Sequence, residues 1–213
     1  MDWGWVGVHS LPFTITRATG PVQNSQGLAY RVTEEVEALR LPGSRALSEH
    51  GRRQAGKVQW HAAAKGTAIE LALNVSLPPS SSAVCHAGLV VRATADRSEQ
   101  TTVSLWSSNR VDLIVNRTLS SLSHNQTKAF QEAPLPSAMM GRTDNTLRVF
   151  VDKSVIEIFV GDHTILSTRV YPTAGDAAAE VGTFSSGGGC ELSGALKSWK
   201  MEDVYRGPRF SQR

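Results

Sequence analysis

Short apolar runs that alternate with polar residues fill the chain from about residue 68 onward, and they limit its fold more than any other feature. Turn-forming stretches such as Pro78-Pro79-Ser80-Ser81-Ser82 separate the runs, and no convincing amphipathic helix lies between them. Such runs predict β-strands, and their recurrence predicts an antiparallel sandwich or barrel. The runs lie at residues 68–77, 86–94, 100–108, 110–118, 147–152, 155–160, 165–173, 178–185 and 190–201.

The clearest pattern is the stretch LRVFVDKSVIEIFVGDHTILSTRVYPT, residues 147–173. Its first run alternates regularly, and Asp152-Lys153-Ser154 is typical of a hairpin turn. The run after the turn, residues 155–160, is apolar on both faces except for Glu157. This composition predicts a central strand that is buried between two sheets.

Glu157 is the first candidate for chemistry, because burial in an apolar strand raises the pKa of a carboxyl group and suits it to general acid catalysis. A retaining glycosidase, however, needs two carboxylates about 5–5.5 Å apart. The nearest one, Asp152, lies in the predicted turn. We therefore favour a structural role, in which Glu157 accepts hydrogen bonds from a neighbouring strand or from Arg169.

Other classes of site have little support in the sequence. The six histidines show no metal-ligand spacing, and the two cysteines are too far apart for a zinc pattern, so we predict no metal and no cofactor. The glycine-rich stretch TFSSGGGCELSG lacks the Gly-Lys-Ser/Thr of a phosphate-binding loop. The net charge of +3 is dispersed along the chain, and no apolar run is long enough to cross a membrane. We expect neither a nucleic-acid nor a membrane partner.

Five tryptophans could stack against sugars or pack in a core, and we favour core packing. Trp3 and Trp5 would share one face of an initial strand, Trp60 and Trp106 would lie in sandwich strands, and Trp199 would lie in the last strand.

Two features favour the secretory pathway. Three sequons, at Asn74, Asn116 and Asn125, fit glycosylated surface loops. The cysteines, Cys85 and Cys190, are even in number but far apart, which leaves a disulfide and two buried thiols open, and we favour the thiols. The N-terminus shows no signal-peptide pattern.

Residues 1 to about 45 differ in character and are interpreted as a connector. The stretch RATGPVQNSQG is rich in turn formers. Further on, Thr33 is placed to cap a short helical turn that carries three glutamates and ends before Pro42-Gly43.

The motifs from residue 144 to 201 strongly resemble the C-terminal β-sandwich of glycoside hydrolase family 32, which includes invertases, inulinases, levanases and fructosyltransferases. At the front of the chain, GWVGVHSLPFTI is similar to the family's final propeller strand, and EEVEALR is similar to its linker; Phe13 replaces the usual Arg. The motifs are Val151-Asp152, Lys153-Ser154, Ile156-Glu157-Ile158-Phe159, Thr168-Arg169-Val170-Tyr171-Pro172 and Leu196-Lys197-Ser198-Trp199-Lys200-Met201.

The resemblance implies an all-β, concanavalin-like sandwich of two antiparallel sheets at residues 46–206, preceded by a propeller remnant and linker at 1–45 and followed by a tail at 207–213. It implies structural roles for motif residues in the sandwich. These are Asp152, Ser154, Glu157, Phe159, Arg169, Tyr171, Pro172 and Trp199.

The family's retaining cleavage of β-fructofuranosyl bonds uses carboxylates of an N-terminal five-bladed propeller, in Asn-Asp-Pro, Glu-Cys and Arg-Asp-Pro motifs. This sequence contains no Asp-Pro and no Glu-Cys. The resemblance therefore implies no catalytic residue here, and a chain that is inactive alone.

The expected partner is the catalytic propeller of a secreted or vacuolar enzyme. Contact with sucrose or fructan, and oligomerisation, stay open. An accessory domain predicts an exposed apolar patch around Trp3 and Trp5 and unpaired strand edges near residues 1–20. The alternative, a free-standing module that binds carbohydrate or protein, predicts a covered surface with one aromatic groove.

Overall fold

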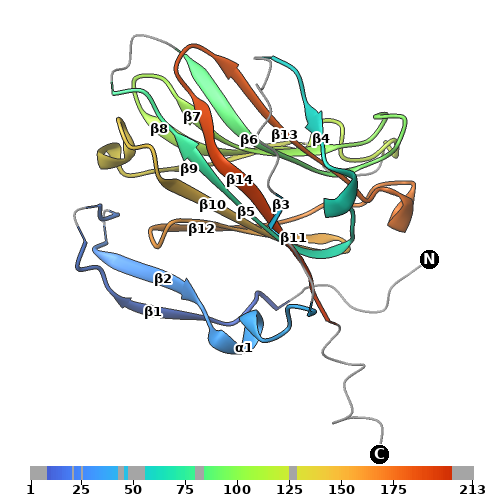
Figure 1. The fold of residues 1–213 in the computed structure, drawn as a ribbon, viewed down its shortest axis with the longest axis horizontal. Helices are drawn as coiled ribbons and strands as arrows, with labels where there is room; N and C mark the ends of the chain where they lie inside the picture. The colour runs from blue at the N-terminus through green and yellow to red at the C-terminus, as the bar shows by residue number, and fades with distance from the viewer. Residues whose placement is uncertain are drawn as a thin grey trace, which may run out of the picture.

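The computed structural model describes residues 9–20, 22–24, 26–42, 46–47, 56–79, 84–124 and 129–202. Within these residues the chain forms two six-stranded antiparallel sheets packed face to face, as well as a two-stranded ribbon (Figure 1). The predicted all-β sandwich is thus confirmed. None of the helices in these ranges reaches the length and hydrophobicity that a membrane span requires.

The first sheet has the order β12-β11-β10-β5-β14-β3. Its strands are β3 (Ala46–Leu47), β5 (Ala68–Ser76), β10 (Asn145–Asp152), β11 (Val155–Val160), β12 (Thr164–Arg169) and β14 (Glu191–Lys200). The second sheet has the order β4-β13-β6-β7-β8-β9. Its strands are β4 (Gln59–Trp60), β6 (Cys85–Ala93), β7 (Thr101–Ser107), β8 (Val111–Asn116), β9 (Phe130–Pro134) and β13 (Glu180–Gly187).

The main core lies between the two sheets, where alternate residues of each strand interdigitate. Leu71, Leu105 and Ile158 are completely buried there. The predicted hairpin is confirmed. The pairing of β10 with β11 runs from Leu147 opposite Val160 to Asp152 opposite Val155, and only Lys153 and Ser154 lie between the strands.

A third layer covers the outer face of the first sheet. It consists of β1 (Phe13–Arg17), β2 (Leu28–Val32) and the short helix α1 (Glu34–Glu37), which lie below that sheet in Figure 1. Val36 of α1 packs in a second, smaller core with Phe150 and Phe159 of the sheet. Thr33 is the N-cap residue of α1, as predicted, although its side chain makes no capping hydrogen bond.

Short 3-10 helices complete the fold: η1 (Ala62–Ala64), η2 (Ser137–Met139) and η3 (Gly175–Ala177). Each predicted run from residue 68 onward contains a strand. The sequence analysis placed Trp60 in a sandwich strand, which is β4, but it predicted neither the β1–β2 pairing nor the strands β3 and β9. The boundaries of the connector and the tail stay predictions.

The prediction of two free thiols was wrong. Cys85 and Cys190 form a disulfide although they are 105 residues apart in sequence. Cys85 begins β6 in the second sheet, whereas Cys190 directly precedes β14 in the first, so the bond joins the two layers of the sandwich.

Candidate functional site

One row of side chains crosses the outer face of the first sheet, under the N-terminal layer. The strand register places Trp199, Glu70, Phe150 and Glu157 opposite one another on β14, β5, β10 and β11. These positions alternate with residues that fill the main core, so the row faces the ribbon and α1. The row contains two carboxylates, with Phe150 between them.

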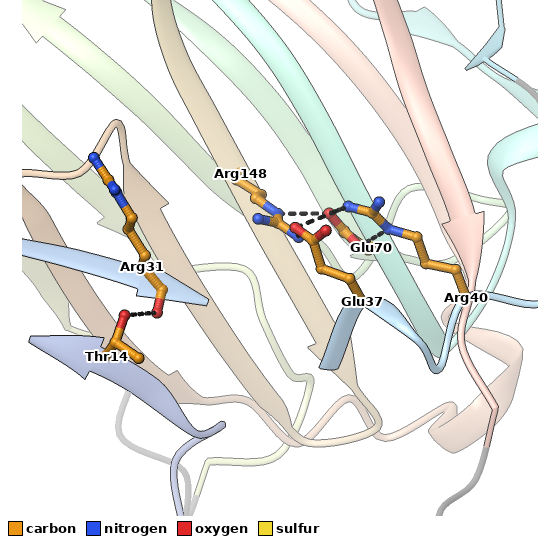
Figure 2. A network of polar contacts seen from close by, with 6 residues as sticks. All are labelled: Thr14, Arg31, Glu37, Arg40, Glu70 and Arg148. Atoms are coloured by element: carbon orange, nitrogen blue, oxygen red, sulfur yellow. Dashed lines mark hydrogen bonds and ion pairs between the residues drawn. The ribbon is translucent and has the colours of Figure 1, made fainter. Parts of the chain in front are cut away.

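Glu70 is completely buried and binds two arginines. Arg40, which follows α1, donates through Nε to Oε2 at 2.7 Å and through Nη2 to Oε1 at 2.8 Å. Arg148 of β10 donates through Nε to Oε1 at 2.5 Å and through Nη2 to Oε1 of Glu37 at 2.8 Å. Figure 2 shows that this network joins the linker helix to strands β5 and β10.

The network also holds an aromatic ring. The Arg40 guanidinium lies 4.2 Å from the ring centroid of Trp199, which is a cation–π distance. The hydrogen bonds that Arg40 donates to Glu70 raise the pKa of Arg40 further above its already high value. Trp199 of β14 therefore helps to hold Arg40, which follows α1, against the first sheet.

Glu157 is buried and accepts two hydrogen bonds. The backbone N–H of Leu11 donates to Oε2 at 2.8 Å, and the hydroxyl of Ser167, on neighbouring β12, donates to Oε1 at 3.3 Å. The predicted bond from a neighbouring strand is thus present. Burial raises the pKa of Glu157, and these two bonds only partly offset the effect. Arg169, the other predicted donor, instead donates to Oγ of Ser154 at 3.2 Å.

The two carboxylates do not form a hydrolytic pair. Glu70 and Glu157 lie on strands that both flank β10, which puts their backbones about 10 Å apart at a strand spacing of about 4.8 Å. Both side chains are buried under the N-terminal layer and already bind donors. A substrate therefore has no access to either one in the described structure.

The remaining motif residues have separate structural places. Asp152 is exposed at the hairpin, and Phe159 packs edge-on against Phe13 and Phe150. Tyr171 is exposed with the Arg169 guanidinium 4.9 Å from its ring centroid. Pro172 beside it is buried.

Glu99 was missed by the sequence analysis. It lies in the turn between β6 and β7, its side chain is buried, and its carboxylate accepts three backbone N–H bonds: from Leu122 at 2.7 Å, from Thr173 at 2.6 Å and from Ala174 at 3.0 Å. Burial alone raises the pKa of Glu99, but these bonds outweigh it and lower the pKa. The carboxylate ties three loops together at one end of the sandwich.

Trp60, Trp106 and Trp199 lie in strands β4, β7 and β14, as predicted, but their packing and the places of two sequons differ from the expectation. Asn74 is exposed within β5 and Asn116 ends β8, so both lie in strands rather than loops. Trp60, Trp106 and Trp199 are half-buried and belong to neither hydrophobic core, which contradicts the favoured core packing. Asn125, Trp3 and Trp5 lie outside the described residues.

The comparisons with known proteins agree with this architecture. The family model "Glycosyl hydrolases family 32 C terminal" matches residues 35–201. A sucrose-6-phosphate hydrolase from Zymomonas mobilis is 25% identical over 206 residues, which cover 94% of this chain and 36% of that protein. The chain thus spans about a third of the length of this curated relative.

Solved structures show the same fold. Fructan 1-exohydrolase IIa from Cichorium intybus matches with a TM-score of 0.71 at 18% identity, over 94% of this chain and 42% of that one. Exo-inulinase from Aspergillus awamori matches with a TM-score of 0.67 at 20% identity, over 91% of this chain and 36% of that one. The chain belongs to glycosyl hydrolase family 32 and corresponds to the C-terminal β-sandwich domain of that family.

Proposed function

We propose that the chain acts as the C-terminal accessory domain of a β-fructofuranosidase-type enzyme, that it docks to a catalytic propeller domain, and that it does not hydrolyse sugars alone. The larger part of each relative has no counterpart here: the matches cover only 36% of the Zymomonas mobilis enzyme and 42% of the Cichorium intybus enzyme.

The observation that carries the proposal is the open edge of β1. Among the described residues β1 pairs only with β2. Four of its five residues are exposed, and the Ile15 side chain is 57% exposed. A two-stranded ribbon with an unpaired edge is a template for further strands. The stretch that resembles the family's final propeller strand, residues 4–15, ends within β1, so a propeller blade is the natural partner.

The direction of one hydrogen bond identifies the groups on that edge. The N–H of Tyr30 in β2 donates to the carbonyl of Asp162 and therefore not to β1. Tyr30 lies opposite Ile15 in the ribbon, and the two residues therefore form a non-hydrogen-bonded antiparallel pair. In such a pair the N–H of Ile15 points away from β2. This N–H is available to an added strand.

The second support is the fixed position of the ribbon. Glu70 binds the linker through Arg40, and Glu157 binds the segment before β1 through Leu11. These contacts hold the open edge in one orientation relative to the sandwich. A docked catalytic domain would then be held rigidly rather than tethered.

A fusion tests the proposal. The Zymomonas mobilis enzyme would be truncated to the part that this chain does not match and then joined to this chain. We expect the chain alone to release no fructose from sucrose, sucrose 6-phosphate or inulin, and the fusion to be more active and more heat-stable than the truncated enzyme. Fructose release by the chain alone would refute the proposal.

Two variants of the fusion make the test specific. Ile15→Pro removes the edge N–H without removing a β1–β2 hydrogen bond, so it should cancel most of the gain. Ile15→Ala keeps the N–H and serves as the matched control. Equal effects of the two variants would show that the edge does not pair.

The proposal includes maturation in the secretory pathway. A disulfide between Cys85 and Cys190 suits an oxidising compartment, and the exposed side chain of Asn74 suits a glycan. Expression in a secreting eukaryotic host followed by deglycosylation with an amidase should lower the apparent mass. Asn74→Gln and Asn116→Gln variants would assign the sites.

A further inference from the structure

The outer face of the second sheet carries exposed aromatic rings. No described helix or strand lies over this face, whereas the ribbon and α1 cover the outer face of the first sheet (Figure 1). His86 of β6 and Trp106 of β7 stand directly opposite one another, and Phe184 of β13 lies diagonally next to His86. All three side chains are half-buried.

The three rings hold one another in place. His86 and Trp106 are stacked with centroids 4.7 Å apart and planes 6° apart. Phe184 meets His86 edge-on at 5.5 Å. Ring pairs in these arrangements are attractive, so the cluster is pre-organised before any ligand arrives.

The rings are not needed to fill the core. On the same strands, the neighbouring residues Ala87, Leu89 and Leu105 point inward and are completely buried. Contiguous apolar groups on an open face are candidates for binding sites.

Polar groups frame the rings. Ser186 pairs with His86 on one side, and Asp112 pairs with Trp106 on the other. Asp112 is 5% exposed; its Oδ2 accepts a hydrogen bond from Nε of Arg110 at 2.7 Å, while its Oδ1 has no partner among the described residues.

Gly88 keeps side-chain atoms out of the space beside the rings. It lies between Phe184 and Ser104 in the strand register. A Cβ at this position would lie 2.1 Å from the carbonyl oxygen of Val103, so the packing of β6 against β7 requires glycine. The half-buried Phe184 and Ser104, which is only 4% exposed, therefore flank a position without a side chain.

This combination defines the chemistry of a ligand. Aromatic rings bind the apolar C–H face of a sugar ring, and a half-buried hydroxyl such as that of Ser186 binds its hydroxyl groups. The carboxylate of Asp112 is already paired with Arg110, so the site has no excess charge that would select an ion. We infer that the face formed by His86, Trp106 and Phe184 binds a neutral oligosaccharide.

Carbohydrate titrations of the full 213-residue chain test this inference. The probes are an inulin-type fructo-oligosaccharide and a β-glucan oligosaccharide of equal length, followed by calorimetry and by the NMR signals of the His86 ring. We expect at least one probe to bind at millimolar concentrations or below and to shift the His86 signals. The two probes distinguish a fructan ligand from another polysaccharide.

Two tryptophan variants localise the binding. Trp106→Ala should weaken it about tenfold or more, since loss of one stacking partner of about 1.4 kcal/mol has this effect. Trp199→Ala is the matched control, because Trp199 is equally half-buried but lies on the other sheet under Arg40.

The inference is overturned if neither probe binds, or if binding leaves the His86 signals unchanged. It is also overturned if Trp106→Ala, shown to be folded by its thermal unfolding, binds as the unmodified chain does. The titrations involve no catalytic domain, so their outcome is independent of the proposed accessory function.

Discussion

Arg40 and Glu70 form a bidentate ion pair that joins the linker to the centre of the first sheet, with N–O distances of 2.7 and 2.8 Å. Glu70 is fully buried, whereas about a quarter of the Arg40 side chain is exposed at 26%. The pair therefore binds a segment at the surface to a residue in the interior. Attachment of the segment around Arg40 therefore contributes to the free energy of unfolding of the sandwich.

Replacing Glu70 by Gln should lower the free energy of unfolding by about 2–3 kcal/mol, because Arg40 and Arg148 then keep only the half-buried carboxylate of Glu37 as a counter-charge. Urea denaturation measures this effect. Arg31→Ala is the control, since its ion pair with Asp162 is exposed and worth less than about 1 kcal/mol. Equal losses for the two variants would contradict the role of the buried network.

Glu157 should make the fold less stable as the pH rises. Burial raises the pKa of Glu157, so the folded chain favours the protonated carboxyl group. The contribution of this group to the free energy of unfolding is fully present below the ordinary carboxyl pKa and is lost as the pH rises through the raised pKa. Glu157→Gln keeps an acceptor for Leu11 and removes this dependence. Unfolding curves of both proteins between acid and neutral pH provide the comparison; parallel pH profiles would be the contrary result.

Glu99 should have the opposite pH dependence. Its pKa is lowered, so its stabilisation is present above the ordinary carboxyl pKa and is lost as the pH falls through the lowered value. Glu99→Gln should cost about 2 kcal/mol at neutral pH and progressively less in acid. Hydrogen exchange of the amides of Leu122 and Thr173 should accelerate in the variant, and unchanged exchange would argue against the three-loop clamp.

Reduction of the disulfide should destabilise the chain without changing its fold. The bond between Cys85 and Cys190, which are 105 residues apart, restricts the unfolded chain, and its removal frees that chain. Removal of a native disulfide lowers the free energy of unfolding by about 2–5 kcal/mol. Cys85→Ser with Cys190→Ser should lower the thermal midpoint by the same amount as a reductant. A reductant that also lowers the midpoint of the double variant would point to another cause.

The strands of the sandwich could be predicted because their apolar alternation is strong, and the buried hydrogen-bonded role of Glu157 followed from the same pattern. Glu70 lies in an equally apolar run, so the reasoning applied to Glu157 could have found it. Its partners could not be found in this way, since Arg40 and Arg148 are distant in sequence and no local pattern pairs them.

Other features left no local signal. Glu99 lies in a polar turn, where a glutamate that binds three backbone amides looks like any surface residue. The disulfide depends on the stacking of two sheets, which brings Cys85 and Cys190 together only in the finished fold. Strand β9, with the sequence FQEAP, contains a proline and two polar residues, so its composition does not indicate a strand. It lies at the edge of the second sheet and is recognised only by its pairing with β8.

The place of β14 constrains how the chain can be made. This strand is the fifth of six in the first sheet and pairs with β5 on one side and with the two-residue strand β3 on the other. Until Glu191–Lys200 have been synthesised, β5 is left with one side unpaired. Pairings of such long sequence separation form slowly and leave strand edges exposed meanwhile. A chain that ends before β14 should thus be prone to aggregation, and chaperone binding during translation should persist until Glu191–Lys200 emerge.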